Sequence, residues 1–286
     1  MHRKATVTWL VAIILYAIAG TVATPADDKP LTLGIFPRWS AQITVRDFTP
    51  LAELLTRELG RPVRIETDKD FDSFMRRVYA KEFDIVHLNQ MQYLNAHDKV
   101  HYRLIAKICD NPTCVIKAVI IVRKDRNINK LGDLKGKIIA FADPNATVSY
   151  VLAKSLLRAS DIQPPQYKTI FVKNPPNAVL AVYNGEADAA GVGWSVLLKP
   201  EIRQRIDVNQ FNILAESRPL PHLPIAVRAD MNTKLMRKIQ KILITLRQRA
   251  DGRAALQKIG LDRIEAAKDY EYNTVRELIH EEHISH

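Results

Sequence analysis

Apolar residues along the first part of the chain alternate between short continuous runs and segments with helical spacing. The runs at 31–36, 63–67 and 83–88 are typical of buried strands. The segments at 47–59 and 71–80 place apolar residues on one face of a helix, and a glycine follows the first of them. Strands that alternate with helices predict an α/β protein with a largely parallel sheet.

A second series with the same order of elements begins at the apolar run 115–122. Further strands and a helix are expected at 138–141, 167–172, 177–184 and 187–192. The two series also contain a short similar sequence, which is YAKEFD at residues 79–84 and YNGEAD at residues 183–188. We therefore predict two lobes of similar construction, whose facing strand ends frame a cleft.

The last part of the chain combines a proline-rich connector with helical patterns. Three prolines fall within residues 217–224, after an expected strand at 211–216. This composition favours an extended segment that carries the chain back to the first lobe. From residue 232 to residue 283 the apolar spacing is helical, and we expect these helices to pack on the first lobe.

The segment that follows the expected strand at 138–141 is the main candidate for a binding site. Asp143, Pro144 and Asn145 favour a turn, and Ala146 and Thr147 then begin a helix. The first N–H groups of a helix lack partners and carry the positive end of its dipole, so they attract anions. An ordinary capped turn between strand and helix is the alternative interpretation.

The N-terminus has the pattern of a secretory signal peptide. Arg3 and Lys4 precede an apolar stretch at 9–19, and small residues follow around Ala23 and Ala26. An uncleaved anchor is the competing interpretation, but the stretch is shorter than the roughly 20 residues that span a bilayer. We expect residues 1–26 to be removed and the mature protein to reside in the periplasm, without stable insertion in the membrane.

Charge and cysteine content narrow the choice of function. The 42 basic and 31 acidic residues give a formal net charge of +11, which falls to +9 when two basic residues leave with the signal peptide. The basic residues are scattered, so nucleic acid is not an expected partner, whereas small anions are attracted. Cys109 and Cys114 favour a local disulfide in an oxidising compartment. The alternative is a reduced pair of thiolates for a thiophilic metal or metalloid.

The sequence carries no catalytic signature that would indicate an enzyme. It contains no nucleophile elbow, phosphate-binding loop, zinc-protease motif or dinucleotide fingerprint. Acidic residues at 66–72 flank a strand and a helix start, where they are usually solvated or capping. The spacing of His87, His97 and His101 matches no zinc site. We expect no enzymatic activity, no metal and no cofactor.

Several stretches together resemble the phosphonate, phosphite and phosphate-binding branch of the periplasmic solute-binding proteins. The resemblance is carried by residues 84–86, 93–96, 131–136, 141–149, 178–188 and 216–221. It implies two α/β lobes, each a mostly parallel sheet with flanking helices, joined by two hinge crossings at 115–122 and 219–227. Lobe 1 would comprise residues 27–118 and 222–286, and lobe 2 would comprise residues 119–221.

The same resemblance implies a set of ligand-binding residues: Trp39, Tyr93, Asn145, Ala146, Thr147, Val148, Ser149, Asn177 and Trp194. Tyr93 matches a ligand-facing tyrosine of the family, Trp39 lies in a loop that usually contributes, and both could equally serve packing. Asn177 and Trp194 stand where a histidine and an acidic residue usually face the ligand. Asn89 and Gln90 are further candidates for the wall of the site.

The helix start departs from the Ser-Thr-Ser run that phosphonate binders of the family usually show. Residues 146–148 read Ala-Thr-Val, so only the hydroxyl of Thr147 remains there. Each lost hydrogen bond to a charged oxygen costs about 1.5–3 kcal/mol, so two losses weaken a phosphonate by more than about tenfold. The resemblance implies capture of a small oxyanion or phosphonate-like ligand for an ABC permease. The alternative function is presentation of an oxyanion, arsenite for example, to a membrane histidine kinase.

Overall fold

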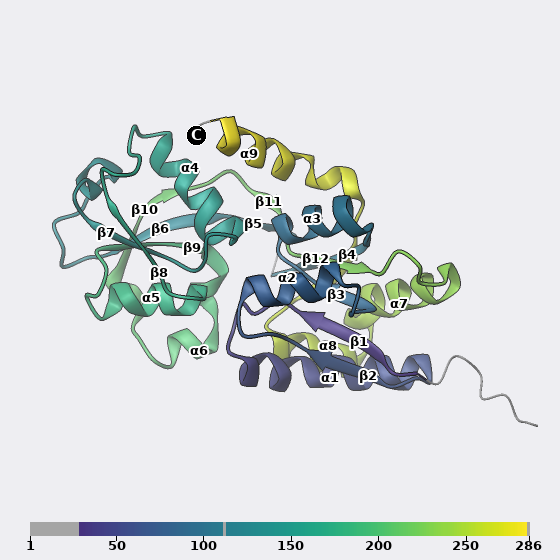
Figure 1. The fold of residues 1–286 in the computed structure, drawn as a ribbon. Coiled ribbons are helices and arrows are strands. Elements are labelled where there is room, and N and C mark those ends of the chain that lie inside the picture. Colours follow the sequence, from purple (N-terminus) through teal and green to yellow (C-terminus); the bar gives the residue numbers. More distant parts are fainter. Residues whose placement is uncertain (1–28, 111–112, 285–286) are drawn as a thin grey trace, which may run out of the picture.

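The computed structural model describes residues 29–110 and 113–284. Figure 1 shows two lobes that face each other and are joined by β5 (Val115–Ile116) and β11 (Leu220–Pro221). These two connecting strands pair with each other in antiparallel fashion. The predicted signal peptide lies outside the described residues. Within the described residues, no helix combines the length and the apolar character that a membrane span requires.

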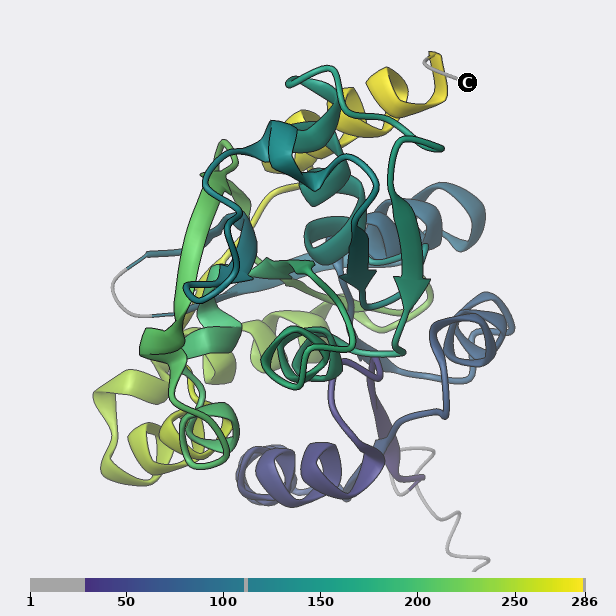
Figure 2. The same cartoon turned by 90° about the vertical axis from the view of Figure 1, so that its left-hand side faces the viewer.

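Lobe 1 is built around a six-stranded sheet whose order, among the described residues, is β13-β4-β12-β3-β1-β2. Its elements come from both ends of the chain, and helices cover the sheet (Figures 1 and 2). They are β1 (Leu31–Ile35), α1 (Ala41–Leu59), β2 (Val63–Glu66), α2 (Phe71–Tyr79), β3 (Ile85–His87), α3 (Gln90–Val100), β4 (Arg103–Cys109), β12 (Pro224–Val227), α7 (Thr233–Thr245), η5 (Leu246–Gln248), α8 (Ala250–Ile259), β13 (Arg263–Ala266) and η6 (Asp269–Tyr272).

Lobe 2 is one continuous segment of the chain around a five-stranded sheet with the order β10-β6-β9-β7-β8 in the described residues. Its elements are β6 (Ala118–Arg123), η1 (Leu131–Leu134), β7 (Ile138–Phe141), η2 (Thr147–Leu152), α4 (Ala153–Arg158), β8 (Lys168–Phe171), α5 (Pro175–Tyr183), β9 (Ala189–Gly193), η3 (Trp194–Leu198), α6 (Pro200–Arg203), η4 (Val208–Gln210) and β10 (Phe211–Glu216). On β6, Val119 and Ile121 pack toward α5, while Ile120 and Val122 join the core on the opposite face.

Both sheets are mixed, although most strands of each sheet run in one direction, as the sequence predicted. In lobe 1, β1 pairs in parallel with β2 and β3, whereas β12 runs antiparallel to β3 and β4. In lobe 2, β7 pairs in parallel with β8 and β9, whereas β6 runs antiparallel to β9 and β10. Each lobe receives one strand from the other lobe, and this strand enters between two neighbours in the opposite direction. In lobe 1 the edge strand β13 is also antiparallel to its neighbour β4.

Three predicted elements differ from the structure. Helix α1 begins at Ala41 rather than residue 47, because Ser40 caps it by accepting a hydrogen bond from the Ile43 N–H. The C-terminal part is not helical throughout, because β13 pairs along β4 at the edge of the sheet. The last helix, α9 (Asn273–Ile284), packs against α3 of lobe 1 and also against η2 of lobe 2, so it does not belong to lobe 1 alone.

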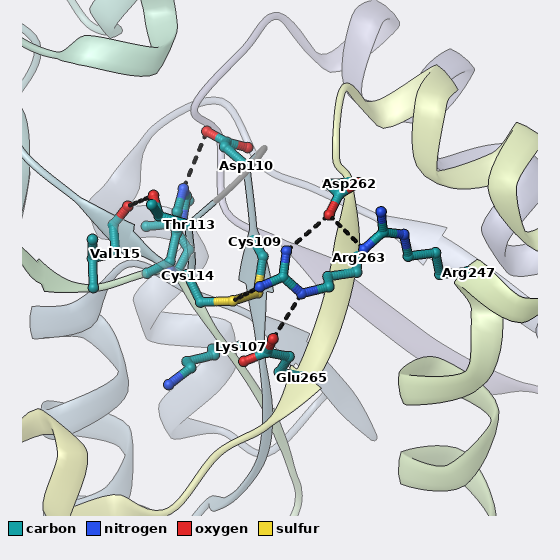
Figure 3. Close-up of a disulfide and its surroundings, with 12 residues drawn as sticks. Lys107, Cys109, Asp110, Thr113, Cys114, Val115, Arg247, Asp262, Arg263 and Glu265 are labelled. Carbon is teal, nitrogen blue, oxygen red and sulfur yellow. Dashed lines mark hydrogen bonds and ion pairs between the residues drawn. A yellow bond between two sulfur atoms is a disulfide. The ribbon is translucent and has the colours of Figure 1, made fainter.

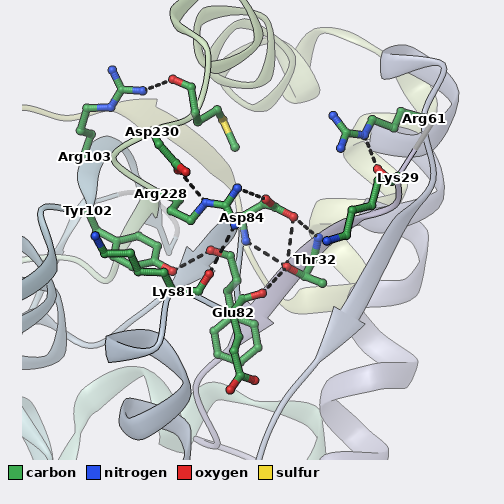
Figure 4. Close-up of polar contacts among 12 residues, drawn as sticks. Lys29, Thr32, Arg61, Lys81, Glu82, Asp84, Tyr102, Arg103, Arg228 and Asp230 are labelled. Atoms are coloured by element: carbon green, nitrogen blue, oxygen red, sulfur yellow. Dashed lines mark hydrogen bonds and ion pairs between the residues drawn. The ribbon is translucent and has the colours of Figure 1, made fainter. Parts of the chain in front are cut away.

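The similar sequences at 79–84 and 183–188 end in aspartates that make the same hydrogen bonds in the two lobes. Asp84 at the start of β3 accepts a hydrogen bond from the Thr32 N–H of β1, and its own N–H donates to the Thr32 carbonyl (Figure 4). Asp188 before β9 makes the same pair of bonds with Ile138 of β7. The aspartates therefore fix the register of parallel strand pairs at corresponding places in the two lobes.

Candidate functional site

A small central cavity lies between the lobes and has a volume of about 50 Å³. One water molecule needs roughly 10–15 Å³ by the same measure, so the cavity accommodates a small polyatomic ion. Both lobes and the connecting strand β5 contribute to its walls. The lining residues are Phe36, Arg38, Phe71, Asn89, Gln90, Ile116, Ala146, Thr147, Val148, Ser149, Pro175, Gly193, Ser195, Val196 and Leu223.

The turn after β7 positions the lobe 2 wall of the central cavity. Asp143 Oδ1 accepts a hydrogen bond from the Asn145 N–H at 2.7 Å, and the Asp143 carbonyl accepts one from the Ala146 N–H. This turn directs the first residues of η2, Thr147 to Ser149, into the cavity. The element begins as a π-helix and continues as α4, so a helical run of two joined elements points its N-terminus at the cavity.

Two serine hydroxyls face the central cavity without partners. Ser149 Oγ in η2 and Ser195 Oγ in η3 are buried, and neither has a hydrogen-bond partner among the described residues. Gln90 Oε1 is in the same situation, while Gln90 Nε2 donates to the Pro221 carbonyl at 2.8 Å. Buried hydroxyls without partners are costly, so a ligand that accepts their hydrogen bonds would relieve this cost.

The hydroxyl of Thr147 is engaged in a contact between the lobes. Its Oγ1 accepts a hydrogen bond from the Met91 N–H at 2.9 Å and donates one to Asn89 Oδ1 at 3.1 Å. Asn89 Nδ2 in turn donates to the Asn145 carbonyl at 3.1 Å. We call these residues, Asn89, Met91, Asn145 and Thr147, the interlobe latch. Because the latch uses both functions of the hydroxyl, Thr147 offers the cavity its backbone N–H rather than its side chain.

Arg38 brings a positive charge to the central cavity from the loop after β1. Its guanidinium lies 5.8 Å from the centre of the Trp39 ring and 6.0 Å from that of Phe36. Burial lowers the pKa of Arg38, and the carboxylate of Asp110 opposes this effect, so the group remains a cation. No hydrogen bond to this guanidinium is present in the described part of the chain.

Asp110 and His222 form a buried pair behind Arg38. His222 Nδ1 accepts a hydrogen bond from the Leu223 N–H, so Nε2 carries the proton and faces Asp110 Oδ2 at 3.1 Å. Burial lowers the pKa of His222, which keeps the imidazole neutral. Burial alone would raise the pKa of Asp110, but His222 and the nearby cations Lys199 and Arg38 hold it well below its usual range.

Three helix N-termini contribute to the wall of the central cavity. Gln90 begins α3, Thr147 begins η2 and Pro175 begins α5, and all three residues line the cavity. The N-terminus of a helix carries about half a positive elementary charge, most of it on free N–H groups. Pro175 and Pro176 have no N–H and the Asn177 N–H bonds Asn174 Oδ1, so α5 offers no free donor in its first turn. The N-termini of α3 and η2 together with Arg38 make the cavity electropositive, and its lining among the described residues contains no carboxylate. The arrangement is suited to a small anion.

The other residues predicted for the ligand lie outside the central cavity. Tyr93 is fully buried, and its hydroxyl donates to Asp269 Oδ1 at 2.6 Å. Trp39 lies beside the Arg38 guanidinium. Asn177 is exposed on α5, where its Nδ2 donates to the Val172 carbonyl. Trp194 is 43% exposed and lines a neighbouring cavity instead.

Sequence reasoning missed Arg38, Ser195 and the part that Pro175 plays in the wall. Arg38 and Ser195 are direct neighbours of two residues that the resemblance singled out, Trp39 and Trp194. The sequence signals therefore lay one position away from Arg38 and Ser195. In an irregular loop after a strand, only the fold determines which of two adjacent side chains points into the cleft.

The predicted disulfide between Cys109 and Cys114 is confirmed, and it closes the chain between β4 and β5 (Figure 3). Arg263 on β13 lies beside it, with Nη2 at 3.3 Å from Cys114 Sγ. The same arginine donates to Asp262 and Glu265 beside it in the sequence, which orients its side chain next to the bridge. The disulfide thus joins the last residue of β4 to the residue before β5, next to Asp110.

The two-lobed fold with a cavity between its lobes defines the class of periplasmic binding proteins. Residues 33–272 match the family described as "ABC transporter, phosphonate, periplasmic substrate-binding protein", and the chain belongs to this family. The resemblance predicted from the sequence is therefore confirmed. The family consists of substrate-binding proteins of the periplasm that work with ABC transporters.

Comparisons with individual proteins agree with this family. The chain is 25% identical over 273 residues to the phosphonates-binding periplasmic protein of Escherichia coli K12, covering 90% of this chain and 79% of that protein. A binding protein component of an ABC phosphonate transporter from Pseudomonas aeruginosa has a TM-score of 0.80 at 19% identity, covering 88% of this chain and 86% of that one. PhnD1 from Prochlorococcus marinus, in complex with methylphosphonate, has a TM-score of 0.79 at 16% identity, covering 87% and 97% respectively.

Proposed function

We propose that this protein captures a small phosphonate or phosphate-like anion in the central cavity and delivers it to an ABC permease. The observation that carries the proposal is that Ser149 and Ser195 direct two buried, unpartnered hydroxyls into one electropositive cavity. A tetrahedral oxyanion presents several acceptor oxygens at once, so one ligand satisfies both donors. The family to which the chain belongs supports the same conclusion.

Some residues of the central cavity would supply hydrogen bonds to the anion, and Arg38 would supply the opposite charge. The oxygens are bound by the N–H groups of residues 147–149 and by the hydroxyls of Ser149 and Ser195. Val148 therefore contributes its backbone N–H, and the backbone of Ala146 positions these residues. Arg38 supplies the compensating charge, and Trp39 orients Arg38 by stacking. Asn145, through its carbonyl, holds the lobes together around the ligand. Tyr93 and Asn177 support the positions of α3 and α5, whose N-termini line the cavity.

Ligand release requires the lobes to separate, and the connecting strands are the place where the chain bends. We assign residues 27–118 and 222–286 to the first moving body and residues 119–221 to the second. The described structure has the interlobe latch formed, which is the arrangement that encloses a ligand. Residues 1–26 serve as a signal peptide that directs the chain to the periplasm.

A binding experiment on the chain without residues 1–26 tests the proposal. Methylphosphonate and inorganic phosphate should each raise the melting temperature, because a ligand that binds only the folded state stabilises it. Ser149→Ala removes one hydrogen bond to a charged oxygen, so Kd should rise by about 10- to 100-fold in isothermal titration calorimetry. Ser155→Ala is the matched control, since that hydroxyl bonds the Leu152 carbonyl within its own helix and should leave Kd unchanged.

The outcome that contradicts the proposal is equally clear. If no phosphonate, phosphate, phosphite or sulfate raises the melting temperature, the central cavity is not an anion site. If Ser155→Ala weakens binding as much as Ser149→Ala, the hydroxyl of Ser149 does not contact the ligand. The alternative of arsenite sensing through thiolates is not favoured, because the disulfide occupies both sulfur atoms.

A further inference from the structure

A second and larger cavity lies next to the central cavity, at the junction of the lobes. Its volume is about 330 Å³, and we call it the side cavity. It is lined by Asp110 and Thr113, by β5, by η3 and by β10. The lining residues are Asp110, Thr113, Val115, Ile116, Lys117, Trp194, Ser195, Leu198, Ile213, Glu216 and His222.

The side cavity gathers large apolar side chains that folding leaves exposed. Val115, Trp194, Leu198 and Ile213 are 40–44% exposed, and all four line this one hollow. They come from three separate elements, β5, η3 and β10. Single exposed apolar residues are common on protein surfaces, but a cluster around a hollow is typical of a binding groove.

The side cavity and the central cavity share two wall residues, Ile116 and Ser195. The Ser195 hydroxyl that we assign to the anion therefore stands at the boundary between them. The central cavity, at about 50 Å³, has room for a phosphonate head group but not for a bulky substituent as well. A substituent that points past Ser195 would enter the side cavity directly.

The charges of the side cavity are internally paired, which indicates the chemistry of its occupant. Lys117 forms an ion pair with Glu216 at the rim, and His222 faces Asp110 at the inner end. The carboxylate oxygens of Asp110 have no hydrogen-bond partner among the described residues, but the cations Arg38 and Lys199 lie close enough to offset the charge of Asp110, which disfavours a further ammonium group there. An uncharged apolar substituent fits this lining better than an amino group does.

A route out of the central cavity on the opposite side is less suitable for an apolar group. The lining of the hollow there is mixed, and it consists of Phe71, Asp72, Met75, Arg76, Tyr79, Met91, Gln92, Asn95 and Asn145. Asn145 Nδ2 also donates to Asp72 Oδ1 at 3.2 Å, and this bond crosses between the lobes. The charged residues Asp72 and Arg76 in this lining and the crossing bond favour the side cavity as the place for an apolar substituent.

We infer that the side cavity is a subsite for the apolar or aromatic substituent of an organophosphonate whose head group occupies the central cavity. The inference rests on the proposed function, because it requires a phosphonate head group at Ser149 and Ser195. It narrows the substrate class from small oxyanions to phosphonates with a substituent of roughly the size of a benzyl or butyl group. Trp194 and Leu198 are the residues that select this class.

The test compares benzylphosphonate, 2-aminoethylphosphonate and methylphosphonate by isothermal titration calorimetry on the chain without residues 1–26. Benzylphosphonate should bind at least about tenfold more tightly than methylphosphonate, as expected for burial of an aromatic ring. 2-Aminoethylphosphonate should gain no such advantage. In Trp194→Ala and in Leu198→Asp, the ratio of the benzyl to the methyl affinity should fall at least about fivefold. Tyr270→Ala is the control, because Tyr270 is an aromatic residue that is 65% exposed and lies outside the side cavity.

The results separate this inference from the proposed function. If methylphosphonate binds and benzylphosphonate binds no better, the subsite is refuted and the anion site stands. The subsite is also refuted if the affinity ratio survives in both variants, or if Tyr270→Ala lowers it equally. If no phosphonate binds at all, both the proposed function and the subsite fail.

Discussion

His87 on β3 illustrates how a single buried side chain makes stability depend on pH. The residue is 2% exposed, its ring lies against Phe36 and Phe48, and its Nδ1 lies 3.2 Å from the Pro224 carbonyl. Burial, together with the nearby positive charge of Arg38, lowers the pKa of His87 from 6.5 to about 3. The imidazole is therefore neutral in the folded protein at every pH above about 3.

The unfolded chain binds a proton at His87 below pH 6.5, while the folded chain does not, so stability falls as the pH falls from about 6.5 toward 3. Between pH 7.5 and pH 5 this single group should remove about 2 kcal/mol from the free energy of unfolding. Urea unfolding at the two pH values measures the loss. In His87→Gln the loss should be smaller than in the wild type by about that amount, and an equal loss in both proteins would contradict the assignment.

At the scale of residues, the sequence predicted several residues that line the central cavity, such as Thr147 and Ser149, but not all of their contacts. The turn at Asp143 and the helix start at Thr147 were recognisable because their local signals, a proline turn and helical spacing, act over a few residues. The partner of the Thr147 hydroxyl was not recognisable, because Asn89 and Met91 belong to the other lobe. Contacts across a cleft depend on how two separately folded bodies meet, and no local pattern encodes that.

At the scale of elements, the interlobe latch couples the start of η2 to the start of α3. Met91 N–H is a first-turn amide of α3, and Thr147 Oγ1 accepts its hydrogen bond from the opposite lobe. Asn89 caps the same helix by accepting from the Gln92 N–H and receives a second bond from Thr147. One hydroxyl thus joins two helix N-termini that both line the central cavity.

Thr147→Val keeps the shape of the side chain but removes the two hydrogen bonds that the Thr147 hydroxyl contributes to the latch. Loss of these bonds should weaken the arrangement in which the lobes enclose the ligand by about 1–3 kcal/mol, which raises Kd about 10- to 100-fold. Calorimetric titration with methylphosphonate measures the change, and the melting temperature without ligand reports on each fold. Thr49→Val is the control, because that hydroxyl bonds the Val45 carbonyl of its own helix.

A normal Kd in Thr147→Val would show that the latch does not contribute to enclosure.

Element prediction itself succeeded where the period was strong, as in β1, α2 and α5, and failed for β13. That strand is short, alternates charged and apolar residues, and pairs only along β4. Its strand conformation is imposed by the sheet edge rather than by its own sequence.

At the scale of the whole molecule, contacts outside the central cavity also hold the lobes together. Lys199 of lobe 2 is 7% exposed, and its Nζ donates to the Gly260 carbonyl at 2.9 Å at the C-terminus of α8 in lobe 1. Arg46 of α1 and Glu201 of α6 form an ion pair at 3.4 Å nearby. The carbonyl end of a helix carries partial negative charge, so the buried ammonium group is well placed there.

Lys199→Met removes the bond to α8 while keeping most of the apolar stem. The closed arrangement should lose part of its stability, so the apparent Kd for methylphosphonate should rise about tenfold, mainly through faster dissociation. Stopped-flow measurements give the rate constants of association and dissociation, and calorimetric titration gives Kd. Lys168→Met, an exposed lysine on β8, is the control and should change neither rate. Unchanged dissociation in Lys199→Met would show that α8 plays no part in retaining the ligand.

The position of β12 in the sheet of lobe 1 determines the order in which a newly made chain is able to assemble. Lobe 2 is complete once Glu216 has emerged, because its strands are continuous in sequence. The sheet of lobe 1 still lacks a strand from its middle at that moment, since β12 inserts between β3 and β4. A polypeptide that ends before Pro224 therefore contains all strands of the lobe 2 sheet. Its lobe 1 sheet is interrupted between β3 and β4, because the four residues of β12 have not yet been synthesised.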